Sequence, residues 1–341
     1  MGTPSRGPHA GLPWKLNAFE PFFRNPHLST LAGNCWKRAI DEPRFPTRET
    51  VYPTEPGTRV LVHENRPTGQ AKAEVVLVHG LEGSSQSGYM VSLAQALCER
   101  GFASHRLNVR GCGGSEHLTP TLYHSGLTAD ALGVLRHLRS KSSAPLFLAG
   151  FSLGGNLTLK LAGELGSDAA SLVSGFIAVS TPIDLAECVR RIDSRENFLY
   201  QRRFVRSLCR RYRRRNLAQP DLFPLNGLDG IRTIYDFDDQ FTAPHFGFGT
   251  AANYYRTQSA LNFVAGIRTP TLVVQAQNDP MIPFPLFSDP RLAGNPAIRL
   301  LAVPHGGHLG FISRHRPRFW LDPVIIHWIT EQLPPGSRLE N

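Results

Sequence analysis

Three almost unbroken apolar runs, at 75–78, 146–149 and 271–276, constrain the fold of this chain more than any other feature. Strands that are apolar on both sides fit a sheet that helices cover on both faces. Further strand-like runs lie at 60–63, 102–107, 176–180 and 298–303, and helical patterns lie at 88–100, 127–140, 152–165 and about 321–333. This alternation predicts an α/β fold with a mostly parallel central sheet.

Two segments depart from the alternation. Residues 1–50 are rich in proline and aromatic residues, and we expect them to wrap the surface without forming a domain of their own. Residues 183–266 interrupt the alternation with an arginine-rich stretch and then a Gly- and aromatic-rich one. An insertion of this length is typical of a lid or a binding element. We therefore predict a core of residues 51–182 and 267–335 with a lid inserted at 183–266.

The strand at 146–149 runs into the sequence Gly-Phe-Ser-Leu-Gly-Gly at 150–155, and a helix with apolar residues at every fourth position follows. This is a G-x-S-x-G pattern between a strand and a helix, the setting that a nucleophilic serine requires. Small residues at 150 and 154 allow the tight turn that exposes the Ser152 hydroxyl. We predict that Ser152 is a nucleophile; the alternative is a structural Gly-Ser turn.

A serine hydroxyl needs a base, and the base needs an acid that fixes its tautomer. Asp279 follows the buried strand at 271–276, at the edge where open sheets place their ligands, and is the predicted acid. Asp184 is the chief competitor, followed by Asp289 and Asp322, and a turn aspartate before Pro280 is the structural alternative for Asp279.

The last strand opens into a loop, 304–311, that holds two histidines. His308 is the predicted general base because Gly306, Gly307 and Gly310 give its backbone room to reach the nucleophile. His305 is the alternative.

Acyl transfer also needs hydrogen-bond donors for the tetrahedral oxyanion. The strand at 75–78 ends in a glycine-bearing turn, so the backbone N–H groups of Leu81 and Leu153 are the predicted donors. His79 has no partners that would make a metal site, and we expect it to brace the turn. The glycine-rich loop at 108–115 lacks the Gly-Lys-Ser/Thr ending of a phosphate loop. We therefore expect no cofactor.

Composition bears on disulfides, metal binding and the cellular compartment. The five cysteines are scattered without a CxxC pair, which favours neither a disulfide framework nor a zinc site. No run approaches the ~20 apolar residues that cross a bilayer, and the first 30 residues lack the apolar stretch of a signal peptide. We expect a soluble, cytoplasmic protein.

The formal charge of +10 is concentrated in one segment. Residues 190–215 carry eleven arginines against Asp193 and Glu196. Phe204, Leu208 and Tyr212 recur there at i, i+4 and i+8, which predicts an amphipathic helix with an arginine-rich outer face. That face is either a solvated helix surface or a docking surface for an anionic membrane or acidic ligand. Because the rest of the chain is almost neutral, we expect no nucleic-acid partner.

Several motifs together resemble the α/β-hydrolases: His-Gly at 79–80, Arg-Gly-Cys-Gly-Gly-Ser at 110–115, Gly-Phe-Ser-Leu-Gly-Gly at 150–155 and Gly-His-Leu-Gly-Phe at 307–311. Asn-Pro-His-Leu-Ser-Thr-Leu at 25–31 resembles the N-terminal signature of the YheT-like branch. The resemblance covers about 20–333 and implies an acyl-ester hydrolase with Ser152, Asp279 and His308 as its triad. In some relatives it implies lipase, phospholipase or alcohol acyltransferase activity.

The sequence thus predicts a serine hydrolase that cleaves small-molecule carboxylic esters through an acyl-enzyme, without a cofactor or metal. An alcohol acyltransferase would use the same residues, and a non-catalytic binding protein could keep the same fold. Aromatic residues of the predicted lid are candidates for an acyl-binding surface or for ordinary core: Phe237, Phe241, Phe246, Phe248, Tyr254 and Tyr255. The physiological ester and the oligomeric state are not readable from these residues.

Overall fold

The computed structural model describes residues 19–334. Residues 1–18 of the predicted wrapping segment and residue 335 of the predicted core therefore lie outside the described residues. The described chain forms an eight-stranded sheet in the order β1-β2-β4-β3-β5-β6-β7-β8. The strands are β1 (Arg48–Glu55), β2 (Thr58–Asn65), β3 (Glu74–Val78), β4 (Ala103–Leu107), β5 (Leu146–Phe151), β6 (Gly175–Val179), β7 (Thr271–Ala276) and β8 (Ile298–Val303).

Strands β1, β2 and β4 pair antiparallel, and all pairs from β4 to β8 are parallel. The predicted α/β fold with a mostly parallel sheet is confirmed. All seven predicted strands are present, but β1 is additional, and it includes residues 48–50 of the predicted wrapping segment. Its side chains are mostly exposed and it contains Pro53, as suits an edge strand, so the sequence carries no apolar run there.

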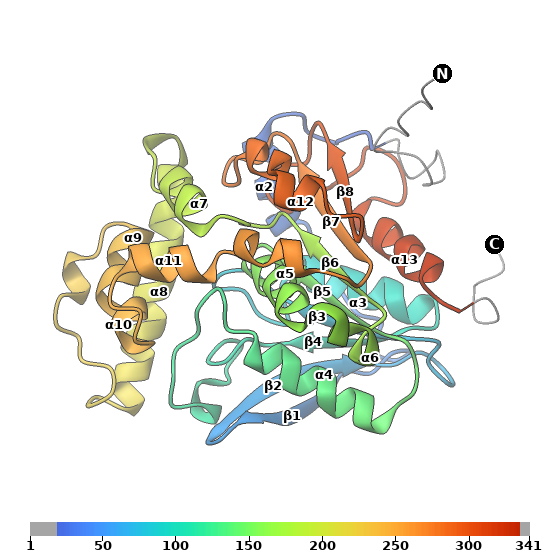
Figure 1. Ribbon diagram of the computed structural model, residues 1–341, viewed down its shortest axis with the longest axis horizontal. Coiled ribbons are helices and arrows are strands. Elements are labelled where there is room, and N and C mark those ends of the chain that lie inside the picture. The colour runs from blue at the N-terminus through green and yellow to red at the C-terminus, as the bar shows by residue number, and fades with distance from the viewer. Residues whose placement is uncertain (1–18, 335–341) are drawn as a thin grey trace.

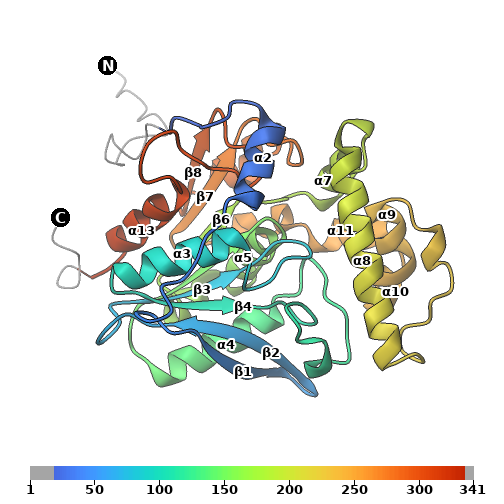
Figure 2. The same cartoon turned by 180° about the vertical axis from the view of Figure 1, so that it is seen from behind.

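Helices cover both faces of the sheet. Helices α4 (Ala129–Lys141) and α5 (Leu153–Leu165) pack on one face (Figure 1), and α3 (Gly88–Glu99) and α13 (Leu321–Glu331) pack on the other (Figure 2). Two separate apolar clusters result, one on each side of the sheet. Strands β3, β5 and β7 are buried at every position, as their apolar runs predict.

Residues 183–266 form a group of helices beside one end of the sheet (Figures 1 and 2). They are α7 (Leu185–Ile192), α8 (Phe198–Ala218), α9 (Ile234–Phe237), α10 (Ala243–His245) and α11 (Ala251–Gln258). We call residues 183–266 the insertion. It has its own apolar cluster, which contains Leu208, Tyr212 and Phe237. Its identity as a lid stays a prediction.

Three further α-helices lie within residues 19–334: α2 (Pro26–Cys35), α6 (Ala169–Leu172) and α12 (Pro290–Ala293). Helix α2 begins at Pro26, directly after Asn25, whose side chain accepts hydrogen bonds from the N–H groups of His27 and Leu28. An Asn cap followed by proline is a strong helix start. No helix in the stretch 19–334 is long and apolar enough to span a membrane.

Candidate active site

Ser152 lies at a sharp turn between β5 and α5. Its φ of 54° and ψ of −120° are unfavourable for a residue with a side chain. Glycines make the turn possible: a Cβ on Gly150 would lie 2.0 Å from the carbonyl oxygen of Gly154, and one on Gly154 would lie 2.3 Å from that of Val78. The Ser152 N–H donates to the Val179 carbonyl at 2.8 Å, which ties the turn to β6. The serine side chain therefore leaves the sheet at its carboxyl edge.

His308 and Asp279 reach Ser152 from the ends of two neighbouring strands. The Nε2 atom of His308 lies 2.9 Å from Ser152 Oγ, and its Nδ1 atom lies 2.9 Å from Asp279 Oδ2. The other carboxylate oxygen, Oδ1, accepts hydrogen bonds from the N–H groups of Met281 at 2.9 Å and Ile282 at 3.2 Å. These donors orient the carboxylate and stabilise its charge. The three residues form one continuous line of hydrogen bonds.

The competing residues lie elsewhere. Asp184 caps α7, where its Oδ1 accepts from the Glu187 N–H at 3.2 Å, and Asp289 is paired with Arg291 at 2.9 Å. His305 contacts Asn278 at 3.4 Å and is half-buried.

Asp322 is buried between α3 and α13, where it accepts a hydrogen bond from Ser92. Burial raises the pKa of its carboxyl from 3.8 to about 7. Between these pH values the folded protein keeps a proton that the unfolded chain has released. The free energy of unfolding therefore falls as pH rises through this window, by up to about 1.4 kcal/mol per pH unit.

We expect Asp322→Asn to remove this slope. Urea unfolding from about pH 4 to pH 8 should show the variant gaining stability relative to the native protein as pH rises. Asp289→Asn is the matched control: Asp289 is partly exposed, and its hydrogen bonds with Arg291 hold its pKa below 3.8, so the slope above about pH 4 should remain. A native-like slope in Asp322→Asn would contradict the prediction.

Helix α2 holds the loop that carries His308. The His308 N–H donates to Thr30 Oγ1 at 2.9 Å, and Thr30 in turn donates to the Pro26 carbonyl at 2.7 Å. The two segments touch through their backbones, because a Cβ on Gly310 would lie 2.1 Å from the Ser29 carbonyl oxygen. Thr30 is not among the residues that the sequence predicts for the site. Two features of the sequence point to the segment that contains Thr30: the Asn-Pro start of its helix and the resemblance of residues 25–31 to the family signature.

Thr30→Val should lower kcat about ten-fold or more, because the buried His308 N–H loses its acceptor and the imidazole shifts. The measurement is steady-state ester hydrolysis, with thermal unfolding as a check on folding. Thr257→Val is the matched control, since Thr257 also donates to the carbonyl four residues earlier, Asn253, at 2.8 Å, but forms no hydrogen bond with His308 among the described residues. Equal effects of the two variants would show that Thr30 does not position the histidine.

The turn after β3 lies beside the serine. A Cβ on Gly80 would lie 2.9 Å from Ser152 Cβ, and Leu81 and Leu153 line the same cavity as Ser152. Their roles as oxyanion donors stay a prediction. His79 braces this turn, as expected: its Nδ1 is 2.8 Å from the Gly80 carbonyl, and its Nε2 accepts from the Val109 N–H at 3.1 Å. Burial lowers the pKa of His79 to about 4, so the ring is neutral.

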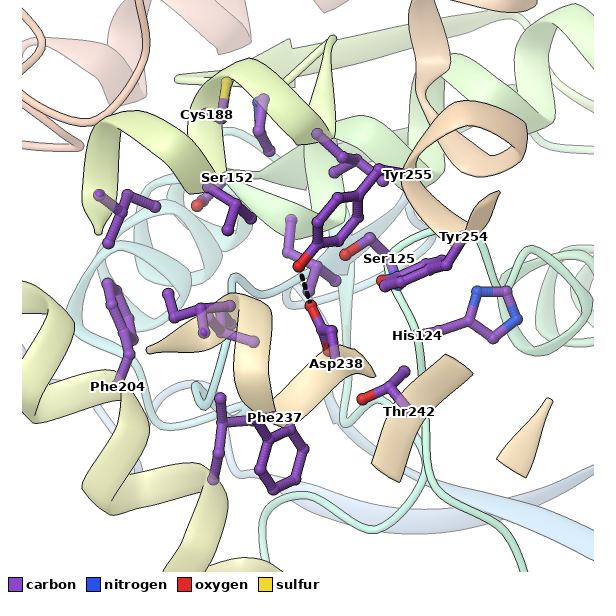
Figure 3. Close-up of a pocket in the computed structure, with 18 of the residues that line it drawn as sticks. His124, Ser125, Ser152, Cys188, Phe204, Phe237, Asp238, Thr242, Tyr254 and Tyr255 are labelled. Carbon is purple, nitrogen blue, oxygen red and sulfur yellow. Dashed lines mark hydrogen bonds between the residues drawn. The ribbon is translucent and has the colours of Figure 1, made fainter. Parts of the chain in front are cut away.

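A largely apolar cavity opens from Ser152 into the insertion (Figure 3). Of the six aromatic candidates, Phe237, Tyr254 and Tyr255 line this cavity. The others lie outside its lining; Phe241, for example, packs on Tyr212 with ring centroids 4.5 Å apart. One polar group stands out in the cavity wall: the Tyr255 hydroxyl donates to Asp238 at 2.7 Å, and Figure 3 shows the two side chains pointing toward one another.

The predicted amphipathic helix is α8, and its apolar residues Leu208 and Tyr212 are buried. Most arginines of α8 are exposed on its outer face, as predicted, but two of them are buried. Arg211 is buried, with an ion pair to Glu82 at 2.7 Å and its guanidinium 4.2 Å from the Tyr123 ring centroid. Arg215 is buried as well and donates to three backbone carbonyls, those of Glu116, Thr119 and Thr121. Both arginines fasten α8 to the core, because a buried guanidinium requires partners.

The chain matches known proteins over most of its length. A family model described as "alpha/beta hydrolase fold" matches residues 74–314. YheT of Escherichia coli (strain K12), which is named as a proposed esterase, is 33% identical to this chain over 320 residues. The match covers 92% of this chain and 93% of YheT. A monoacylglycerol lipase of Saccharomyces cerevisiae is 29% identical over 297 residues, 83% of this chain and 66% of that protein.

Solved structures agree on the architecture. An esterase from Pyrococcus furiosus superposes with a TM-score of 0.58 across 87% of this chain and 99% of that chain. Its sequence identity is 15%, so this likeness concerns the fold.

Proposed function

The chain belongs to the alpha/beta hydrolase family and is an esterase-type hydrolase, and we propose that it cleaves carboxylic esters through an acyl-enzyme formed on Ser152. The observation that carries this proposal is the line of hydrogen bonds from Asp279 through His308 to Ser152, at the mouth of an apolar cavity. Neutral imidazole can accept the serine proton at Nε2 while its Nδ1–H donates to the carboxylate.

In the proposed reaction Ser152 Oγ attacks the ester carbonyl as His308 Nε2 takes its proton. The oxyanion that forms accepts hydrogen bonds from the N–H groups of Leu81 and Leu153. His308 then protonates the departing alcohol, which leaves the acyl group on the serine. Water repeats the sequence and releases the acid, and Asp279 stabilises the imidazolium in both halves.

The cavity supports a substrate with a hydrocarbon acyl group, because most of the side chains that line it are apolar. We propose a small-molecule ester, which the site can take from solution or from a lipid surface. The same residues would transfer the acyl group to an alcohol if that alcohol outcompeted water. Product analysis with added ethanol distinguishes the two reactions, since a transferase forms the ethyl ester.

Labelling with a fluorophosphonate probe tests the proposal directly, because such probes react with an activated serine. We expect one adduct, on the peptide that contains Ser152, and turnover of p-nitrophenyl esters in a panel from acetyl to palmitoyl. A folded protein that neither labels nor hydrolyses any member of the panel would be a binding protein with this fold.

A further inference from the structure

A groove leads from the surface to Ser152 and His308 between α2 and α8. Thr30, Leu31 and Asn34 of α2 line one side of it, and Tyr200, Arg203, Phe204 and Ser207 of α8 line the other. The helices are joined where His27 Nδ1 lies 3.1 Å from the Tyr200 hydroxyl. Figure 2 shows α2 and α8 both on the face of the molecule that is turned toward the viewer. The exposed side chains of α2 and α8 next to this groove therefore surround its entrance.

Large apolar side chains are exposed on both helices. On α2, Leu28 is 49% exposed and Leu31 is 47% exposed, and the three-residue spacing puts them on one side of the helix. At the start of α8, Phe198 is 51% exposed and Leu199 is 78% exposed. Single exposed apolar residues are ordinary, but such residues on both helices beside one groove are typical of an interaction site.

Basic side chains continue the same face of α8. Arg202, Arg203, Arg206 and Arg210 follow Leu199 by three, four, seven and eleven residues, so they share its side of the helix. All four are exposed, and none of them forms an ion pair with a carboxylate within residues 19–334. By contrast, Arg213 and Arg214 on the same helix are paired with Asp229 and Glu116.

We propose that this face docks on the surface of an anionic phospholipid membrane, so that the groove opens toward the lipid. We call it the α2–α8 rim and define it by Leu28, Leu31, Phe198, Leu199, Arg202, Arg203, Arg206 and Arg210. An apolar edge beside unpaired cations matches the interface of such a membrane, where acyl chains lie beneath negative headgroups. The benefit of docking, delivery of ester from the lipid, rests on the proposed function, but the docking itself does not.

A nucleic acid or an acidic protein would satisfy the arginines alone. Neither explains why Leu28 and Leu199 are exposed on separate helices beside the groove. The exposed apolar residues therefore distinguish a membrane from these two partners. For this reason the experiment substitutes the leucines and the arginines in separate variants.

The test is co-sedimentation with vesicles of phosphatidylcholine, with and without phosphatidylserine, in the Ser152→Ala background so that no lipid is consumed. We expect binding to the anionic vesicles that weakens with salt. Changing Arg202, Arg206 and Arg210 to Gln should lower the partition coefficient on the order of 100-fold. Changing Leu28 and Leu199 to Gln should lower it about ten-fold or more. None of these five residues lines the groove.

The matched control changes three exposed arginines elsewhere, Arg136, Arg256 and Arg268, to Gln, which removes the same charge. It should bind like the parent protein. The same rim substitutions should also be made in the protein that keeps Ser152. Each of these variants should hydrolyse a soluble p-nitrophenyl ester at the native rate, which shows that the active site is intact.

Three results would overturn the proposal: no binding to anionic vesicles, an equal loss in the control variant, or a leucine variant that binds as tightly as its parent. The last result would leave an acidic macromolecule as the partner of the arginines. Docking without hydrolysis of any ester would uphold the rim and refute the proposed function instead.

Discussion

Ser152→Ala is expected to lower kcat for ester hydrolysis on the order of 10⁶-fold, the largest effect of any single change in this chain. The variant keeps the turn, the cavity and the His308–Asp279 pair but has no atom that can form the acyl-enzyme. Because alanine is smaller and the backbone at 152 is strained with either residue, we expect little change in thermal unfolding. The measurement is turnover of the best p-nitrophenyl ester found in the panel.

Ser207→Ala is the control for this change. Ser207 lines the groove from α8, but none of its hydrogen bonds reaches His308 among those that the described residues form. It should retain nearly all activity. Near-native turnover by purified, folded Ser152→Ala would remove the serine from the mechanism.

Asp279→Asn is expected to lower kcat on the order of 10⁴-fold. The N–H groups of Met281 and Ile282 hold the Oδ1 position, so an asparagine keeps oxygen there and turns its amide NH₂ toward His308. An amide donor at Nδ1 favours the tautomer with its proton on Nε2, which cannot accept the proton of Ser152. The fold should survive, because the substitution is almost isosteric.

Asp184→Asn provides the comparison. Its carboxylate caps α7, and asparagine is nearly as good a cap, so stability should change little and activity should stay within a few-fold of native. If Asp184→Asn lost more activity than Asp279→Asn while both variants folded, the acid would have to be reassigned.

The sequence predicts the parts of this molecule whose signals are local. Strand β7 was predicted with its observed bounds, because a strand buried on both faces must be apolar at nearly every position. The turn at Ser152 is equally local, since Gly150 and Gly154 are required by contacts within a few residues or with the adjacent strand. The three residues predicted for the triad lie within hydrogen-bond distance of one another.

What the sequence does not reveal depends on partners far along the chain. Strand β1 is an exposed edge strand, and its residues show no apolar run. Thr30 contacts His308 across 278 positions, and the local Asn-Pro pattern predicts the start of its helix but not this contact. Arg211 and Arg215 turn inward because Glu82 pairs with the first and three backbone carbonyls between 116 and 121 accept hydrogen bonds from the second. The arginine-rich run alone predicts an outer face and does not distinguish these two residues. Contacts of this kind follow from tertiary packing.

The ion pair of Arg211 joins α8 to the turn that follows β3. Glu82, its partner, is the residue after Leu81, and its φ of 56° shows that this turn is held in a conformation the backbone does not favour by itself. The Tyr123 hydroxyl, which donates to the Glu82 carboxylate at 3.0 Å, completes the clamp. If α8 swings away from the core to admit an ester, it takes Arg211 with it and frees the turn that carries the Leu81 N–H. If the insertion is a lid and the Leu81 N–H is an oxyanion donor, as the sequence predicts, closure of the one would assemble the other, and the open enzyme would be inactive.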